Sequence, residues 1–369
     1  MKPTTPSLQH AMRLMQSGDL RAATRALQQG LAAGGPHNHA TLHPSDARAA
    51  SDSIDAEFRV VDRAEAADQR DAAAAASARS RGTFEAHHFV GDTGEIDYKL
   101  YIPAGLAKNR APLLLMLHGC TQSPDDFARG TRMNTLADRH GYVVAYPEQS
   151  ASRNPTHCWN WFRRGDQQRA SGEPALLAAL THHLITTHRL DDRRVYVAGL
   201  SAGGAMAAIL ANTHPDLYAA IGVHSGLPIG LASDVPSAFA AMRDGASHRS
   251  ATATDSSSRS VPAIVFHGDH DTTVHPSNGD GVIAQSLANA GVCAAAAGGA
   301  RVERGASAGG RRYTRTVHTL TDGSVAAEHW IIEGAGHAWS GGDAAGSYTD
   351  PHGPDASAQM LRFFSACAR

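Results

Sequence analysis

The sequence has little net charge, few cysteines and no long apolar run. Its 369 residues include 35 acidic and 33 basic side chains, a balance that predicts no surface for nucleic acid or an anionic membrane. Four cysteines are too few for a disulfide scaffold at this length. No stretch approaches the roughly 18–20 apolar residues of a membrane span, and residues 1–20 lack the apolar core of a secretory signal. We therefore expect a soluble, cytoplasmic protein without a transmembrane segment.

The composition changes along the chain and divides it into three parts. Through residues 7–33, apolar side chains mostly recur every three to five positions, which predicts an amphipathic helical hairpin over residues 1–33. Residues 34–80 are rich in Ala, Asp, Arg and Ser, as is typical of a low-complexity linker. Three linker histidines, His37, His39 and His43, lack the rigid frame that a metal site needs.

Residues 81–369 have the pattern of an α/β domain. Helical stretches separate most of its short β-rich runs, which predicts a mostly parallel sheet covered by helices on both faces. Catalytic loops in such folds follow the carboxyl ends of the strands. Residues 245–260 and 293–312 are poor in large apolar side chains and are expected to be surface insertions. The predicted strands are EIDYKLYI, PLLLMLHG, YVVAYPE, RVYVAGL, AAIGVHS, PAIVFHG and WIIEGAGH.

Ser201 is the central residue of a Gly-x-Ser-x-Gly sequence, GLSAG, at the end of a predicted strand. A helical stretch, AMAAILANTHP, follows it directly. A sharp turn between strand and helix lifts a serine out of the sheet, where a base can activate its hydroxyl for attack on an ester. A tight turn that merely contains serine has the same short pattern, so Ser201 needs an acid and a base further along the chain.

The acid is expected in HGDHD, after the strand PAIVF, where Asp269 and Asp271 are both candidates. Asp271 is favoured because it stands further into the loop, although a turn aspartate is the alternative reading. The base is expected last, and His337 in GAGHAW lies in a glycine-rich loop after a strand. His329 falls inside the strand pattern and His352 in a proline-rich stretch, so both are weaker candidates. The acid would hold the imidazole in one tautomer.

An oxyanion hole is the remaining requirement of acyl transfer. One donor is expected to be the backbone N–H of Ala202, which follows the nucleophile. The second is expected from Cys120, in HGC after the strand LLLML. Cys120 could itself be a thiol nucleophile, but the order serine, acid, histidine leaves it no base.

Six motifs together resemble the catalytic domain of poly(3-hydroxybutyrate) depolymerases, and more broadly their esterase family of the α/β-hydrolase fold. They are HGCTQ, CWNWF, GLSAGGAMA, HGDHDTTVHP, GAGHAWSGG and SYTDPHGPDAS. The resemblance covers roughly residues 83–367. It implies a Ser201–Asp271–His337 triad with an oxyanion contribution from Cys120. It also favours Asp271 over Asp269, because members of the family carry the acid in HG-x-x-D.

The resemblance implies a serine esterase that hydrolyses polyhydroxybutyrate-type polyester or 3-hydroxybutyrate oligomers through an acyl-enzyme, with no metal or organic cofactor. The amino-terminal hairpin and linker resemble those of intracellular relatives, which act on storage granules or soluble oligomers. A feruloyl or acetyl esterase of carbohydrate esters is the alternative enzyme. A granule-associated interaction protein with an inactive hydrolase domain is the alternative of another class.

Trp159 and Trp339 lie in motif loops, where an aromatic wall for an apolar ester chain would stand. Trp339 is the stronger candidate for substrate contact, while packing beneath the loops is an equal alternative for Trp159. Cys120 and Cys158 lie in neighbouring motif loops, and a disulfide between them is left open. Two free thiols are the expectation for a reducing cytosol.

Overall fold

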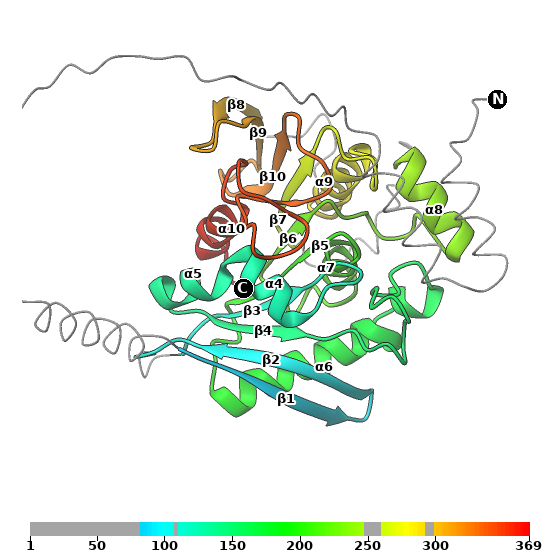
Figure 1. Ribbon diagram of the computed structural model, residues 1–369, viewed down its shortest axis with the longest axis vertical. Helices are drawn as coiled ribbons and strands as arrows, with labels where there is room; N and C mark the ends of the chain where they lie inside the picture. The colour runs from blue at the N-terminus through cyan, green and yellow to red at the C-terminus, as the bar shows by residue number, and fades with distance from the viewer. Residues whose placement is uncertain (1–81, 107–109, 247–259, 292–298) are drawn as a thin grey trace, which may run out of the picture. The chain divides into compact units, whose positions relative to one another are not determined.

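The computed structural model describes residues 82–106, 110–246, 260–291 and 299–369 (Figure 1). All of them belong to one compact unit, Gly82–Arg369. The hairpin predicted over residues 1–33 and the linker predicted over residues 34–80 lie outside the described residues, as does most of the predicted insertion at residues 245–260.

The large sheet of the described unit consists of β1 (Thr83–Gly91), β2 (Gly94–Ile102), β3 (Leu113–Leu117), β4 (Val143–Pro147), β5 (Val195–Leu200), β6 (Ala220–His224), β7 (Ala263–Gly268), β8 (Ala300–Ala306), β9 (Arg312–Thr319) and β10 (Val325–Ile332). Their order across the sheet is β1-β2-β4-β3-β5-β6-β7-β10-β9-β8. From β4 to β10 in this order, neighbouring strands are parallel. The strands at the two edges pair antiparallel. The carboxyl ends of the central strands therefore meet at one edge of the sheet.

Side chains of the central strands alternate between two apolar cores, one on each face of the sheet. In β3 all five residues are buried. Leu113, Leu115 and Leu117 enter the first core, whereas Leu114 and Met116 enter the second. A parallel strand covered on both faces needs apolar side chains at every position, which is why LLLML forms the interior of the sheet.

Helices cover both faces of the sheet (Figure 1). They are α4 (Pro124–Thr131), α5 (Met133–His140), α6 (Gly172–His188), α7 (Ala202–Thr213), α8 (Val235–Asp244), α9 (Ser277–Asn289) and α10 (Ala356–Ser365), with a short 3-10 helix η1 (Arg164–Gln167). Helices α6, α7 and α9 contribute to the first core, and α5 and α10 to the second. None of the described helices is long and apolar enough to cross a membrane.

The predicted strands correspond to β2 to β7 and β10, and the edge strands differ from prediction. The surface insertion predicted at residues 293–312 is wrong for its second half, because Ala300–Ala306 forms β8. Most of the β8 side chains are exposed, so this edge strand carries no apolar pattern. Between β3 and β4 the helical stretch is divided at Arg132, whose left-handed φ of 53° ends α4 and begins α5.

Candidate active site

Ser201 occupies a strained turn between β5 and α7. Its backbone has φ 57° and ψ −118°, and its N–H donates to the His224 carbonyl at 2.8 Å. A Cβ added to Gly203 would lie 2.0 Å from the Leu117 oxygen, and one added to Gly199 would lie 2.3 Å from the Gly203 carbonyl carbon. The glycines of GLSAG therefore let α7 start directly against β3, and this packing holds Ser201 in a backbone conformation that non-glycine residues rarely adopt.

Asp271 follows β7 and is buried, with a relative exposure of 5%. Its Oδ1 accepts the backbone N–H groups of Thr273 and Val274, both at 2.9 Å. Its Oδ2 accepts a hydrogen bond from His337 Nδ1 at 2.7 Å and lies 3.4 Å from His267 Nε2. Burial alone favours the neutral acid, but the charge of His337 and the hydrogen bonds from both histidines outweigh it and hold the pKa of Asp271 well below its usual range.

The competing candidates for acid and base have other partners. The Asp269 carboxylate accepts the Gly334 N–H at 2.7 Å, so it shapes the loop after β10. His329 is buried in β10, with Nδ1 3.6 Å from Asp280. Of the three histidines considered as base, His337 is the one bonded to Asp271.

His337 lies in the loop after β10, and its Nδ1 is engaged by Asp271, which leaves Nε2 as the nitrogen for proton transfer. In the described structure no hydrogen bond joins Nε2 to the Ser201 hydroxyl. Such bonds are often long without substrate and tighten in the reacting complex. The structure thus joins acid and base directly, and the loops that carry Ser201 and His337 follow strands of the same parallel sheet.

His224, at the end of β6, connects the Ser201 turn with the His337 loop. Its carbonyl accepts the Ser201 N–H, and its Nε2 accepts the Ser340 N–H at 3.0 Å. Its ring stacks on Trp339 with centroids 5.3 Å apart. Burial above all lowers the pKa of His224 to about 3, so this ring stays neutral and acts as an acceptor. Sequence reasoning missed His224, although a histidine at the end of a buried strand is a signal that marks it.

The loop after β3 presents the Cys120 amide. The N–H of Gly119 donates to Gln122 Oε1 at 2.9 Å. The N–H groups of Thr121 and Gln122 donate to the carbonyls of Thr156 at 2.8 Å and Gly119 at 3.3 Å. Among the described residues, no acceptor is recorded for the Cys120 N–H. Since the other three amides of this loop are engaged, the one predicted as an oxyanion donor is available for it.

Ala202 is the first residue of α7, and the first N–H groups of a helix have no partner within it. Its amide follows Ser201 directly, at the positive end of the helix dipole. The position predicted for this oxyanion donor is therefore electrostatically suited to an anion.

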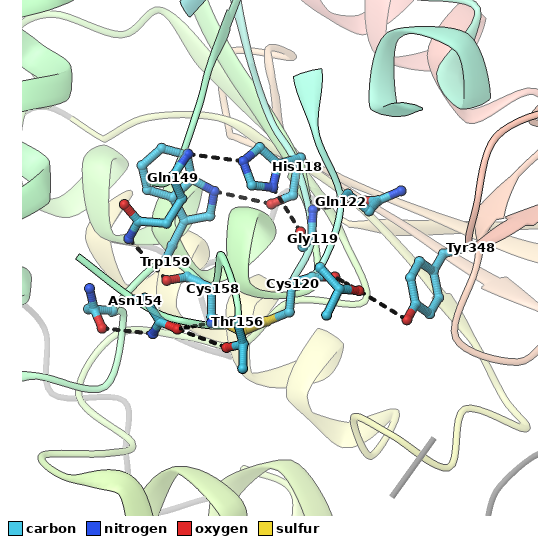
Figure 2. Close-up of a disulfide and its surroundings, with 12 residues drawn as sticks. His118, Gly119, Cys120, Gln122, Gln149, Asn154, Thr156, Cys158, Trp159 and Tyr348 are labelled. Carbon is cyan, nitrogen blue, oxygen red and sulfur yellow. Dashed lines mark hydrogen bonds between the residues drawn. A yellow bond between two sulfur atoms is a disulfide. The ribbon is translucent and has the colours of Figure 1, made fainter. Parts of the chain in front are cut away.

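A disulfide joins Cys120 to Cys158, with Cα atoms 4.2 Å apart (Figure 2). The expectation of two free thiols is therefore wrong. The loops after β3 and β4 lie side by side, because those strands are neighbours in the sheet, and this placement brings together cysteines that are 38 residues apart in sequence. The bond ties the CWNWF loop to the loop after β3, which carries the predicted oxyanion donor Cys120 and is called the oxyanion loop below.

Trp159 and Trp339 do not line an open surface, so their predicted contact with substrate is corrected. Their relative exposures are 0% and 1%. Trp159 Nε1 donates to the His118 carbonyl at 3.1 Å, and Trp339 Nε1 donates to Ser357 Oγ at 3.1 Å. Trp159 packs against the His118 ring, and Trp339, in the two-residue strand β11 (Trp339–Ser340), packs against Phe127 and His224. Both rings are therefore part of the interior packing. No group of three or more metal-binding side chains occurs among the described residues.

This protein has a parallel sheet with helices on both faces, a serine turn after β5, and an acid–base pair whose members follow β7 and β10. These features place it among the α/β-hydrolases. In fold it is similar to an acetyl xylan esterase from Aspergillus awamori, with a TM-score of 0.61 and 20% identity over 77% of this chain and 100% of that one. The chain belongs to the Esterase PHB depolymerase family, whose model matches residues 96–308, more than half of its length. This match includes Ser201 and Asp271, and His337 lies beyond its end.

Two curated relatives extend the comparison. Poly(3-hydroxyalkanoate) depolymerase C of Paucimonas lemoignei is 32% identical over 206 residues, which are 54% of this chain and 49% of that protein. Feruloyl esterase B of Thermothelomyces thermophilus is 28% identical over 206 residues, which are 52% of this chain and 69% of that protein. The chain thus spans about half the length of the depolymerase that it matches.

Proposed function

We propose that this protein is a serine esterase that works through an acyl-enzyme. The observation that carries the proposal is the hydrogen bond of His337 to the buried Asp271, at the same sheet edge as the strained Ser201 turn. Ser201 Oγ attacks the ester carbonyl carbon while His337 Nε2 takes its proton. His337 then returns this proton to the leaving alkoxide as the carbon–oxygen bond breaks, and water hydrolyses the acyl-serine with the same base.

The remaining groups fit this sequence of steps. Asp271, held anionic by its hydrogen bonds, stabilises the imidazolium that forms on His337. In this proposal the N–H groups of Cys120 and Ala202 bind the oxyanion of the tetrahedral intermediate. Loss of one such donor costs roughly 3–4 kcal/mol of transition-state stabilisation, so the two amides matter about as much as the acid.

For the substrate we propose a polyhydroxybutyrate-type polyester or 3-hydroxybutyrate oligomers. The family membership and the depolymerase from P. lemoignei support this choice. A feruloyl or acetyl ester of carbohydrate is the second candidate, favoured by the feruloyl esterase relative. Contact with a polyhydroxyalkanoate granule stays a prediction for residues 1–33.

The test of the esterase is covalent labelling with an organophosphonate, followed by substrate comparison. We expect one equivalent of label on Ser201, no label on S201A, and loss of p-nitrophenyl butyrate hydrolysis by a factor of about 10⁶ in S201A with an unchanged fold. The same enzyme preparation is then compared on amorphous polyhydroxybutyrate granules, soluble 3-hydroxybutyrate oligomers and methyl ferulate. An unlabelled Ser201 would overturn the esterase, and preferred turnover of methyl ferulate would overturn the polyester as substrate.

A further inference from the structure

A buried carboxylate lies behind the oxyanion loop and receives several N–H groups. Glu173, in the first turn of α6, has a relative exposure of 3%. Its Oε2 accepts the backbone N–H of Asn160 at 2.7 Å, and its Oε1 accepts Asn160 Nδ2 at 2.6 Å. Gln149 Nε2 also donates to Oε1. Two acceptor oxygens thus gather three donors, an arrangement that suits the ionised carboxylate.

Two routes connect Glu173 to the Cys120 amide. In the first, the Gln149 backbone N–H donates to His118 Nε2 at 3.1 Å, and His118 Nδ1 donates to the carbonyl of Gly119 at 2.8 Å (Figure 2). The residue after Gly119 is Cys120 itself. Burial lowers the pKa of His118 to about 4, so this ring is neutral and both of its bonds are made as stated.

The second route is the disulfide. Gln149 Nε2 donates to the Cys158 carbonyl at 3.0 Å (Figure 2), while Glu173 also holds Asn160, two residues further on. The segment anchored in this way carries Cys158, whose sulfur is bonded to Cys120. A displacement of the Glu173 carboxylate therefore reaches Cys120 by two paths, one through the Gly119 carbonyl and one through the Cys120–Cys158 bond.

Protonation of Glu173 would break this arrangement. One of its oxygens would become an O–H donor facing N–H donors, so at least one of the three bonds would be lost. Gln149 Oε1 is buried and has no partner among the described residues. If the Gln149 amide turns over, Oε1 accepts the new O–H and Nε2 leaves the Cys158 carbonyl. The proton thus has an acceptor available, and the loop loses an anchor.

The surroundings bring this protonation into the working range of an esterase. Burial, and then the charge of Asp166, raises the pKa of Glu173 to about 7 against the effect of its hydrogen bonds. Asp166, in η1, accepts the Glu173 backbone N–H at 2.7 Å. On the Gln149 side the titratable neighbours are His118 and His157, whose Nδ1 lies 2.7 Å from the Gln149 carbonyl.

We propose that Glu173, in its ionised form, is a positioning residue for the oxyanion donor Cys120. This role rests on the proposed esterase. It has a kinetic consequence, because hydrolysis is then fastest with two groups in their basic forms, His337 as base and Glu173 as anchor. On the acid side, protonation of Glu173 should lower the rate by a limited step, in addition to the loss that protonation of His337 causes. Substrate binding does not depend on the oxyanion contact to the same degree, so kcat should change more than KM.

The experiment compares the unchanged chain, E173Q and E95Q for p-nitrophenyl butyrate hydrolysis from about pH 5 to about pH 9. Glu95 is 71% exposed and serves as the control for a lost carboxylate. In E173Q we expect kcat about tenfold lower at alkaline pH, since a displaced donor costs less than a deleted one, with KM within about twofold. In the unchanged chain, protonation of Glu173 should add a step of about tenfold to the acid limb of log kcat/KM against pH, whereas E173Q should lack this step and show the single slope of one that His337 gives. E95Q should match the unchanged chain.

Several outcomes would overturn this role. An E173Q enzyme with full kcat and the same acid limb does so, as does an equal loss of kcat at every pH with the acid step retained. Absence of phosphonate labelling in the unchanged chain overturns the esterase and this role with it, whereas normal labelling with an unaltered E173Q profile overturns this role alone. If E173Q does not fold, Q149M tests the same link, because it removes the donor shared by Glu173 and Cys158. Full kcat in Q149M would then reject the proposal.

Discussion

Glu173 also has an effect on stability, opposite in direction to its proposed effect on activity. Its carboxylate holds the CWNWF loop, yet an anion at 3% exposure is costly to keep ionised. The raised pKa measures that cost, because the folded protein binds the proton more tightly than the unfolded chain does. The ionised residue thus lowers the stability of the fold at neutral pH, while it accepts the three hydrogen bonds that hold the loop.

The stability of E173Q relative to the unchanged chain should depend on pH. With a pKa of about 7 in the folded state against 4.5 in the reference state, the contribution of Glu173 is fully present below the lower value. This contribution to the free energy of unfolding falls by about 3 kcal/mol as the pH rises from the lower pKa to the higher pKa. Urea unfolding at about pH 4.5 and about pH 8 should show E173Q gaining this amount relative to the unchanged chain. A difference that stays constant, as expected for E95Q, would contradict the assigned pKa.

The two tryptophans show what residue type alone leaves undecided. An aromatic side chain in a motif loop is compatible with a substrate wall and with a buried support. The outcome depends on whether the loop folds outward or back onto the strand ends, which is a tertiary property. Trp159 and Trp339 fold back, each with its indole N–H on a buried acceptor.

At the scale of elements, the serine turn depends on how closely α7 approaches β3. Neither strand nor helix leaves room for a methyl group at Gly203, where an added Cβ would lie 2.0 Å from the Leu117 oxygen. A shift of β3 to relieve that contact would move His118 and the loop behind it. Stability and oxyanion geometry are therefore coupled at this glycine.

G203A should destabilise the protein and impair turnover together. We expect a loss of about 2–3 kcal/mol in the free energy of unfolding, typical of overpacking, and a lower kcat from displacement of the β3 loop. Gly165 is the matched control, since an added Cβ has nothing within 4 Å there, and G165A should stay within about 0.5 kcal/mol of the unchanged chain. Chemical denaturation and initial rates measure both effects. Equal stabilities of G203A and G165A would contradict the close approach.

Much of the element pattern was predictable from sequence, and the exceptions have physical causes. Central strands buried on both faces must be continuously apolar, so β3 to β7 stand out in the sequence. Edge strands such as β8 lie largely in solvent and carry no such pattern. The motif order predicted the acid–base pair that the structure joins at 2.7 Å. Glu173 and His224 escaped prediction, because their roles come from contacts between segments far apart in sequence.

At the scale of the whole molecule, the Cys120–Cys158 bond closes a covalent ring that contains α4, α5 and β4. Disulfides persist in oxidising compartments and are rare in the cytosol. The bond therefore counts against the cytoplasmic location expected from the sequence, and location stays a prediction that thiol alkylation of freshly isolated protein would test.

Reduction of this disulfide should weaken the fold and the activity together. Closing a loop with a sequence separation of 38 residues constrains the unfolded chain by about 4 kcal/mol in the chain-entropy model. We expect dithiothreitol to lower the free energy of unfolding by up to that amount, and to lower kcat because Cys120 loses an anchor. C158S should show both losses without reductant and no further change with it. Unchanged stability after complete reduction, verified by maleimide labelling, would contradict the stabilising role.

The order of the strands along the chain determines when each residue of the site is synthesised. Ser201 follows β5 in the middle of the sheet, but β10, which presents His337, is the last strand of the large sheet along the chain. A nascent chain that lacks β10 therefore has a serine turn and an oxyanion loop but no base. The proposed hydrolysis therefore requires that almost the entire described unit has left the ribosome.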